Sequence, residues 1–371
     1  MKATIVTYDD EFAKREIQEL AKAGGYSVEA VITQKQVIKS GYGVGVGKAQ
    51  ELFELVSDNG SDTLIIDETL TSSQANNLAK VTHVEVVDRE RLILNIFALR
   101  AATTEAKLQV QLAELRYEMP RARDVVRYSV RGERAGFSGM GETAVDVKFR
   151  ALKHRMSTIR SKLANAGSSR TVQRKERMKL GEPFVSFAGY TSSGKTTLFN
   201  RLASEAKEES PKLFTTLTTT TRSITVPGSK KRVMLSDTVG FISRLPTYLV
   251  ESFKSTLEEL TYADLVLLVI DVSENPESVR IKFDSCKGVL GELGVDPKKT
   301  LLVLNKQDLV QGRGDTLGSG DLFEGFPTVR TSATRGDGMR QLRNRIFELT
   351  RDKNAQLPRA KDGFHQVPPG A

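Results

Sequence analysis

The chain has 371 residues, of which 39% are hydrophobic and 27% charged, and this length and composition predict a water-soluble protein of two or three domains. Its net charge of +9 and its isoelectric point of about 9.4 indicate a polyanionic partner, either nucleic acid or an acidic surface. Its single cysteine excludes an intramolecular disulfide, and its three scattered histidines exclude a zinc site built from Cys and His.

The N-terminal part of the chain alternates runs of β-branched residues with helix-like stretches. Strands are expected at Ala3–Tyr8, Val28–Thr33, Thr63–Asp67 and Val84–Asp88, and helices at 10–23, 48–59 and 72–80. Thr71 and Gln74 form a capping-box pattern that opens the third of these helices. The alternation predicts an α/β domain over residues 1–98 with a small parallel sheet flanked by helices.

The glycine-rich stretch Gly41–Lys48 lies within this region. Its spacing matches neither the Walker nor the dinucleotide-binding fingerprint. We therefore interpret it as a flexible loop, with a second nucleotide site as the alternative.

A helical arm is expected over residues 99–181. No helix breaker interrupts the stretch Arg89–Met119, so one long helix is expected to end at Pro120. A basic, glycine-containing loop is expected over 121–141, and a second long helix over Glu142–Lys179. Two long helices joined by a loop are expected to pack as an antiparallel hairpin.

The second half of this arm is strongly basic. Residues 148–179 contain eleven Lys or Arg and one acid. Charge of one sign would repel itself on an isolated surface, which favours contact with the phosphates of a structured RNA. A solvated helix face is the alternative interpretation.

The C-terminal part alternates strands and helices again over residues 182–350, and 351–371 are expected to form a flexible tail. Strands are expected at 183–190, 222–227, 231–237, 264–272, 300–305 and 327–333, and helices near 195–206, 247–261, 276–293 and 337–350. The fourth and fifth strands are almost continuously apolar, which predicts a sheet covered on both faces. Cys286 is expected to be a small buried hydrophobic residue rather than a reactive thiol.

Two features bear on location. The longest apolar run, Leu265–Ile270, has the length of a buried strand and is far shorter than a membrane span. The start of the chain shows no apolar signal region. A cytoplasmic protein without stable membrane insertion is expected.

The most specific motif is Gly-Tyr-Thr-Ser-Ser-Gly-Lys-Thr at 189–196, a complete G-x-x-x-x-G-K-[ST] phosphate loop. It follows an expected strand and opens an expected helix, so backbone N–H groups can hold phosphates there. Lys195 is expected to reach the β- and γ-phosphates, and the Thr196 hydroxyl to coordinate Mg²⁺. A chance glycine-rich turn is the alternative. The candidate phosphate-binding residues are Gly189, Tyr190, Thr191, Ser192, Ser193, Gly194, Lys195, Thr196 and Thr197.

A D-x-x-G motif, Asp237 to Gly240, ends another expected strand. Its carboxylate can contact Mg²⁺ through water, and the Gly240 N–H can meet the γ-phosphate. The tract Phe214–Arg222 supplies threonines, one of which can join Mg²⁺ when the γ-phosphate is present, and the residues alone do not decide which. Phe241 cannot orient a water, so intrinsic hydrolysis is expected to be slow and to need a partner. The candidates here are Phe214, Thr215, Thr216, Asp237, Thr238, Val239 and Gly240.

The third motif, Asn305-Lys-Gln-Asp308, follows an apolar strand. The Asp308 carboxylate can accept hydrogen bonds from both N1–H and the exocyclic amine of guanine, and adenine does not present this donor pair. The motif therefore selects GTP over ATP, with a charged surface turn as the alternative. The candidate base-binding residues are Asn305, Lys306, Asp308, Ser332, Ala333 and Thr334. The three motifs together predict binding and hydrolysis of GTP.

With these motifs the chain resembles the HflX family of GTPases across essentially its whole ordered length. The N-terminal likeness rests on Gly45-Val-Gly-Lys48, Asp88-Arg89, Leu92–Ala98, Tyr117, Pro120-Arg121 and Gly139-Met-Gly-Glu-Thr143. Three places depart from the family pattern: Ser192 replaces Asn, Thr218-Thr219 replace Asp-Pro, and Ala144-Val-Asp146 replace Gln-Leu-Glu.

The resemblance implies a function and assigns the switch threonine. By residue match Thr216 joins Thr196 and Asp237 as a metal ligand, and Lys195, Thr216 and Gly240 are the candidate catalytic residues. The family implies binding to the large ribosomal subunit through rRNA, ribosome-stimulated hydrolysis, and a role in ribosome splitting or rescue. An RNA-remodelling or RNA-processing factor and a membrane-surface scaffold GTPase remain alternatives. A monomer is favoured.

Overall fold

The computed structural model describes residues 1–35, 41–132, 147–167, 182–203, 213–214, 216–217, 219–225, 232–310 and 322–351. The chain separates into two compact units, 1–165 and 166–371. The expected domain limits at 98/99, 181/182 and 350/351 stay predictions. The expected tail lies outside the described residues from 352 onward.

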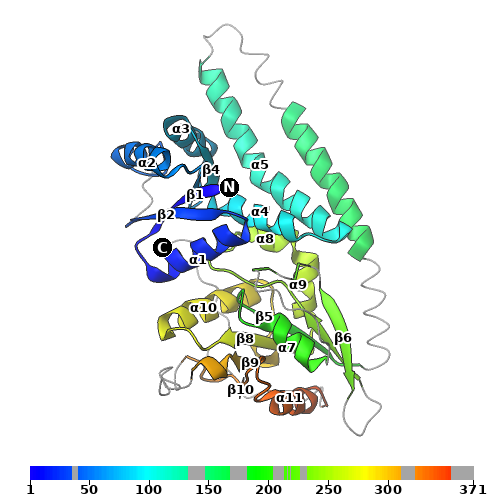
Figure 1. Cartoon of the computed structure of the whole chain (residues 1–371). Helices are drawn as coiled ribbons and strands as arrows, with labels where there is room; N and C mark the ends of the chain where they lie inside the picture. The colour runs from blue at the N-terminus through cyan, green and yellow to red at the C-terminus, as the bar shows by residue number, and fades with distance from the viewer. Residues whose placement is uncertain are drawn as a thin grey trace. The chain divides into compact units, whose positions relative to one another are not determined.

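The first unit contains a four-stranded parallel sheet in the order β2-β1-β3-β4 (Figure 1). Its strands are β1 (Lys2–Tyr8), β2 (Ser27–Gln34), β3 (Thr63–Ile66) and β4 (Glu85–Asp88), and its flanking helices are α1 (Glu11–Ala23), α2 (Val46–Asn59), α3 (Ser72–Thr82) and α4 (Arg89–Arg100). Leu52 and Val56 of α2 pack with Leu64 and Ile66 of β3 in its core. The predicted small parallel sheet is confirmed.

Two local predictions have different outcomes. The capping box is confirmed: the Thr71 hydroxyl accepts from Gln74 N at 3.2 Å, and Gln74 Oε1 accepts from Thr71 N at 3.0 Å. The interpretation of Gly41–Lys48 as a loop is wrong for its last three residues, because α2 begins at Val46 after Gly45. The backbone of Gly45 is extended there, so glycine acts as the helix N-cap without a side-chain hydrogen bond.

The single long helix expected up to Pro120 is also wrong. Helix α4 ends at Arg100, and α5 (Thr104–Gly132) starts after Thr103, whose hydroxyl accepts a hydrogen bond from Ala106 N at 3.1 Å. Helix α5 then continues through Pro120, so residues 121–132 are helical and not part of the expected loop. Residues 133–146 and 168–181 lie outside the described part of the chain, and 147–167 are helical as expected.

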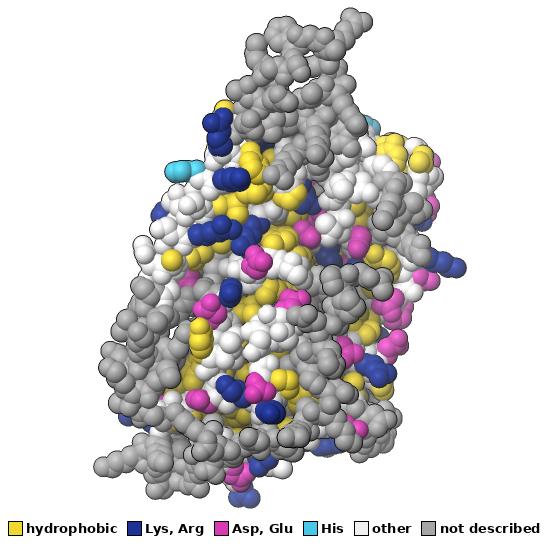
Figure 2. All heavy atoms as spheres, turned by 180° about the vertical axis from the view of Figure 1, so that it is seen from behind, with side chains coloured by type: hydrophobic (Ala, Val, Ile, Leu, Met, Phe, Trp, Pro, Cys, Tyr) yellow, Lys and Arg dark blue, Asp and Glu magenta, His cyan; other side chains and the backbone are white. Residues whose placement is uncertain are grey.

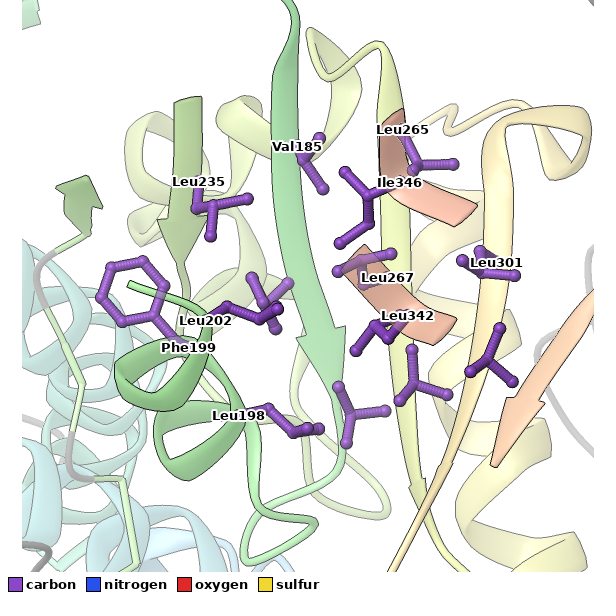
Figure 3. Packing of buried hydrophobic residues seen from close by; sticks show 14 of the residues in the cluster. Val185, Leu198, Phe199, Leu202, Leu235, Leu265, Leu267, Leu301, Leu342 and Ile346 are labelled. Carbon is purple, nitrogen blue, oxygen red and sulfur yellow. The ribbon is translucent and has the colours of Figure 1, made fainter. Parts of the chain in front are cut away.

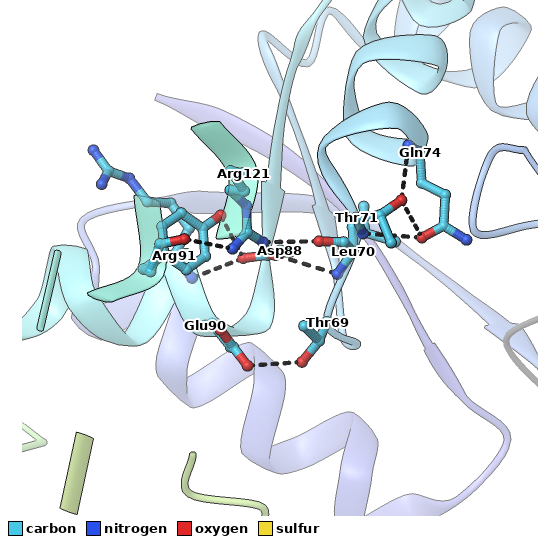
Figure 4. Close-up of polar contacts among 9 residues, drawn as sticks. Thr69, Leu70, Thr71, Gln74, Asp88, Glu90, Arg91 and Arg121 are labelled. Carbon is cyan, nitrogen blue, oxygen red and sulfur yellow. Dashed lines mark hydrogen bonds and ion pairs between the residues drawn. The ribbon is translucent and has the colours of Figure 1, made fainter. Parts of the chain in front are cut away.

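A buried polar network around Asp88 helps to explain why α5 continues past its proline (Figure 4). Asp88 Oδ1 accepts from Arg91 N at 2.8 Å and from the Tyr117 hydroxyl at 3.1 Å. Asp88 Oδ2 accepts from Leu70 N at 3.2 Å and from Arg121 Nη2 at 2.5 Å. Burial raises the pKa of Asp88, and the Arg121 charge opposes that shift. These contacts hold the turn that contains Pro120 against α4 and the β3–α3 connection. They offset the loss of the backbone hydrogen bond that proline cannot make.

Helix α5 and the helix at 147–167 lie side by side and run in opposite directions (Figure 1). Leu112 and Leu115 of α5 share a buried cluster with Met156 and Ile159. The two residues of each pair are three positions apart and therefore lie on one face of their helix. Amphipathic helices pair through such apolar faces. The predicted helical hairpin is confirmed.

The second unit contains a six-stranded sheet in the order β10-β9-β8-β5-β7-β6, with only β6 antiparallel to its neighbour among the described strands. Its strands are β5 (Phe184–Gly189), β6 (Thr220–Thr225), β7 (Arg232–Asp237), β8 (Leu265–Asp271), β9 (Thr300–Asn305) and β10 (Thr328–Arg330). Its helices are α7 (Lys195–Leu202), α8 (Thr247–Ser252), α9 (Lys254–Thr261), α10 (Pro276–Glu292) and α11 (Met339–Arg351), with short turns at η1 (Pro297–Lys299) and η2 (Gln307–Leu309).

One face of this sheet is covered by α7 and α11. Figure 3 shows Leu198 and Leu202 of α7, and Leu342 and Ile346 of α11, packed on side chains of the central strands such as Leu267. The helix expected at 247–261 is interrupted at Phe253, which is buried and separates α8 from α9. The predicted α/β fold class is confirmed by this arrangement.

Cys286 is buried on α10, as expected, and burial raises the pKa of its thiol to about 12. The thiol is therefore protonated at neutral pH and packs as a small apolar group. None of the helices in the described part of the chain combines the length and the apolar character needed to cross a membrane.

Candidate functional site

The phosphate-loop motif lies between β5 and α7 and requires glycine at two positions. Gly189 has φ +146°, and a Cβ there would lie 2.4 Å from the Val269 carbonyl oxygen. Gly194 has φ +93°, and its Cβ would lie 2.3 Å from Asn305 Nδ2. Any side chain at either position would displace neighbouring atoms, so glycine is required by space as well as by backbone conformation. Helix α7 begins at Lys195, which places its N-terminus at the loop.

Lys195 is buried beneath this loop. Its Nζ donates to the Gly189 oxygen at 3.0 Å and to the Tyr190 oxygen at 2.7 Å. Burial lowers its pKa to about 8, although the nearby Asp237 carboxylate acts in the opposite direction. An ammonium group has three donors, so one remains for a phosphate oxygen beside the loop.

Thr196, Thr216 and Asp237 form a cluster of oxygen atoms next to Lys195. Asp237 Oδ2 accepts from both threonine hydroxyls at 2.8 Å, and the two hydroxyl oxygens are 3.3 Å apart. Asp237 Oδ1 is buried and has no hydrogen bond within the described residues. Burial raises the pKa of Asp237, and Lys195 opposes that shift. Oxygen ligands of this kind suit Mg²⁺, and a cation here would meet a carboxylate oxygen that has no partner.

The D-x-x-G segment is paired directly with the phosphate loop. Phe241 N donates to the Gly189 oxygen at 3.0 Å, and Thr191 N donates to the Phe241 oxygen at 2.7 Å. A Cβ on Gly240 would lie 3.0 Å from Lys195 Nζ, so the segment passes close to the lysine. Phe241 is buried, with 1% of the residue exposed. This residue therefore cannot orient an attacking water through its side chain.

Asn305 connects the base-binding motif to two other loops. It is buried, its Nδ2 donates to the Ser193 oxygen at 2.9 Å, and its Oδ1 accepts from Ala333 N at 3.1 Å. The Lys306 ammonium forms an ion pair with Asp271 at 2.6 Å. Because Asn305 contacts both loops, it fixes the distance between the phosphate end and the base end of the site.

Asp308 lies beside the Ser332–Thr334 segment, as expected for a shared base site. The Thr334 hydroxyl donates to Asp308 Oδ2 at 3.4 Å. A hydrogen bond from Ser332 is the main cause that lowers the pKa of Asp308. The carboxylate is ionised at neutral pH and can accept two hydrogen bonds from a guanine base.

The structure thus brings the predicted residues together around one loop, with phosphate-side and base-side groups joined by Asn305. Thr238 and Val239 are buried with Asp237, Thr197 follows Thr196 on α7, and Phe214 is buried with φ +54°. Thr215 lies outside the described residues.

One supporting residue was not predicted. Arg201, on α7, donates to the carbonyl oxygens of Ala333, Thr334 and Arg335 at 2.9, 2.8 and 3.1 Å and so holds the Ser332–Thr334 segment. A basic residue in the last turn of a helix was the only local signal.

Comparison with known proteins extends the likeness over almost the whole chain. Residues 12–98 match the family described as GTP-binding GTPase N-terminal, residues 100–177 match GTP-binding GTPase Middle Region, and residues 184–306 match 50S ribosome-binding GTPase. The crystal structure of a complex of SsGBP and GDP is similar, with 27% identity, a TM-score of 0.51, and coverage of 94% of this chain and 98% of that one.

Curated relatives named GTPase HflX are more similar in sequence. The protein of Thermococcus kodakarensis is 43% identical over 302 residues, which cover 81% of this chain and 68% of that protein. The protein of Hyperthermus butylicus is 35% identical over 363 residues, which cover 94% and 96% of the two chains. With this identity over most of both chains, and with the GTP-binding geometry described above, the chain belongs to the HflX family of GTPases.

Proposed function

We propose that this GTPase associates with the large ribosomal subunit through its basic helix, and that this association stimulates Mg²⁺-dependent hydrolysis of GTP. A role in ribosome splitting or rescue follows from the same family likeness. The description of the family matched by residues 184–306, 50S ribosome-binding GTPase, supports the choice of partner.

The observation that carries the proposal is the exposed face of the helix at 147–167. The six basic side chains of this segment are all exposed, and the segment contains no Asp or Glu: Lys148, Arg150, Lys153, Arg155, Arg160 and Lys162. Its apolar residues face α5 instead. Figure 2 shows Lys and Arg side chains gathered over hydrophobic ones in the upper left of that view. Exposed basic side chains with no acid among them, on a helix whose apolar side is already covered, suit a phosphate backbone.

At the nucleotide we propose that Lys195 holds the β- and γ-phosphates and that the Gly240 N–H holds the γ-phosphate. Thr196, Thr216 and Asp237 would hold Mg²⁺, which neutralises phosphate charge when bound. Asp308 would read the guanine base. Because the Phe241 side chain cannot position water, hydrolysis would depend on a group supplied or ordered by the partner.

The ribosome proposal is tested by changing basic side chains of this helix alone. Replacing Arg155, Arg160 and Lys162 with Gln should weaken co-sedimentation with purified large subunits. The log–log salt dependence of binding should also become shallower, by roughly 0.7–0.9 units for each phosphate that the variant no longer neutralises. GTP affinity should not change, since none of these residues belongs to the nucleotide site. Ribosome-stimulated GTP turnover is measured on the same preparations.

A matched control variant loses the same three positive charges at other positions of the first unit. Arg15, Lys22 and Lys80 are exposed on α1 and α3, and their replacement with Gln should leave ribosome binding unchanged. Equal binding by both triple variants would contradict the proposal. Retained affinity for anionic liposomes but not for ribosomes would instead favour the membrane-surface alternative.

The metal assignment predicts a selective effect at Thr216. Replacing Thr216 with Ala should leave GDP affinity unchanged but weaken binding of a non-hydrolysable GTP analogue by about tenfold or more. This hydroxyl is expected to reach Mg²⁺ only when the γ-phosphate is present. Titration of both nucleotides with Mg²⁺ in excess checks this, with Thr221→Ala in the same tract as the control. Equal affinities of the Thr216 variant and the wild type for the analogue would place the switch threonine elsewhere.

A further inference from the structure

Glu259, on α9, is a buried carboxylate outside the nucleotide-binding motifs, with 6% of the residue exposed. Its two oxygens accept hydrogen bonds from two hydroxyls that are distant in sequence. Oε2 accepts from Ser236 in a very short contact, and Oε1 accepts from Thr219 at 3.3 Å. A buried carboxylate needs such donors, because an oxygen left without one carries the full desolvation penalty.

The two hydroxyls come from the segments that carry the proposed metal ligands. Ser236 directly precedes Asp237 on β7, and Thr219 lies three residues after Thr216. Strand β6 begins at Thr220, which pairs with Asp237 across the antiparallel ladder. Glu259 therefore joins the Thr216 segment, the Asp237 strand and helix α9 at one point.

This contact restricts where Thr216 can lie. Only two residues separate Thr216 from Thr219, and one of them, Leu217, is 3% exposed. While Thr219 stays on Glu259, so short a connection limits how far Thr216 can move from the other ligands. In this arrangement the Thr216 hydroxyl is 2.8 Å from Asp237 Oδ2.

We propose that Glu259 is a positioning residue that acts through Thr219 to hold Thr216 at the metal-binding oxygens and thereby favours the triphosphate-bound state. This inference rests on the proposed role of Thr216. The contact depends on the Thr219 hydroxyl, which donates to Glu259 Oε1 at 3.3 Å.

The test changes Thr219 and not Glu259, because loss of the carboxylate would also leave the buried Ser236 hydroxyl unpaired. T219V keeps the shape of the side chain and removes the hydroxyl, T219S keeps the hydroxyl, and T221V is the matched control in the same tract. Affinities of the full-length proteins for GDP and for a non-hydrolysable GTP analogue are measured with Mg²⁺ in excess. T219V should bind the analogue about tenfold more weakly and GDP normally. T219S and T221V should behave like the wild type.

Three results would overturn the inference. T219V could bind the analogue as tightly as the wild type does, or it could lose the same affinity for GDP as for the analogue. T219S could also bind the analogue as weakly as T219V does. Equal losses would mean that Thr219 only supports the fold. Thr216→Ala is measured in parallel to separate this inference from the function on which it rests. If that variant binds the analogue normally, the proposed switch role fails and the inference fails with it. If Thr216→Ala weakens the analogue and T219V does not, only the role of Glu259 fails.

Discussion

Replacing Asp308 with Asn is expected to reverse the base preference of the nucleotide site. The Asp308 carboxylate can accept hydrogen bonds from two donors of guanine, and an amide can accept only one of them while its NH₂ group faces the other. Hydrogen bonds to a charged group contribute about 1.5–3 kcal/mol each. GTP affinity should therefore fall by roughly a hundredfold or more. Xanthosine triphosphate, which presents an acceptor where guanine has its amine, should bind better than GTP.

Competitive titration with GTP, xanthosine triphosphate and ATP checks the reversal. Asp308 is held by the Thr334 hydroxyl at 3.4 Å, and Asn can keep that contact, so the loop should retain its shape. Asp284→Asn is the matched control, since Asp284 is exposed on α10 and its replacement has the same effect on net charge. If Asp308→Asn bound GTP as tightly as the control does, the assignment of residues 305–308 to the base site would be wrong.

The elements around the nucleotide site could be predicted because their chemistry is local. Strand β9 was predicted at its observed limits, 300–305, and the D-x-x-G and phosphate-loop motifs lie at the ends of strands as expected. In each case a short run of residues must have a particular conformation for a reason visible in the sequence. Gly189 and Gly194 are examples, because no other residue fits the space that the structure leaves.

The helical arm shows where local rules fail. Proline normally ends a helix because it lacks a donor and its ring clashes with the preceding turn. Helix α5 nevertheless passes through Pro120, where the next residue, Arg121, donates to Asp88 and to the Leu70 oxygen at 2.8 Å. These partners lie 33 and 51 residues away, so no pattern within the helix could reveal them.

The same limit applies to the candidate site. The three motifs could be read from the sequence, but their connections could not. Asn305 donates a hydrogen bond to the Ser193 oxygen, which is 112 residues away in the sequence. Arg201 donates one to the Ala333 oxygen, which is 132 residues away. Such contacts exist only once the parallel sheet has brought the carboxyl ends of its strands together.

Replacing Lys195 with Ala is expected to weaken the binding of triphosphate strongly. The Lys195 ammonium keeps one donor for phosphate after its bonds to the Gly189 and Tyr190 oxygens, and its charge is buried. This contact should contribute about 1.5–3 kcal/mol, taken as one charge-assisted hydrogen bond to a phosphate oxygen. Affinity for a non-hydrolysable GTP analogue should fall by roughly 10–10²-fold, and affinity for GDP, which lacks the γ-phosphate, should fall less.

The thermal unfolding temperature of the nucleotide-free protein distinguishes this loss of affinity from unfolding. Burial lowers the pKa of Lys195 to about 8, so between that pH and the pKa of an unfolded lysine the folded protein binds fewer protons than the unfolded chain. By linkage this shift opposes folding at neutral pH, whereas removal of the ammonium also leaves the buried Asp237 carboxylate without its opposing charge. Lys282→Ala is the matched control, because Lys282 Nζ lies 5.1 Å from the Tyr190 ring and pairs with Glu274 at 2.5 Å. If both variants lost the same affinity, the effect would reflect the general positive potential near the loop and not a direct contact with phosphate.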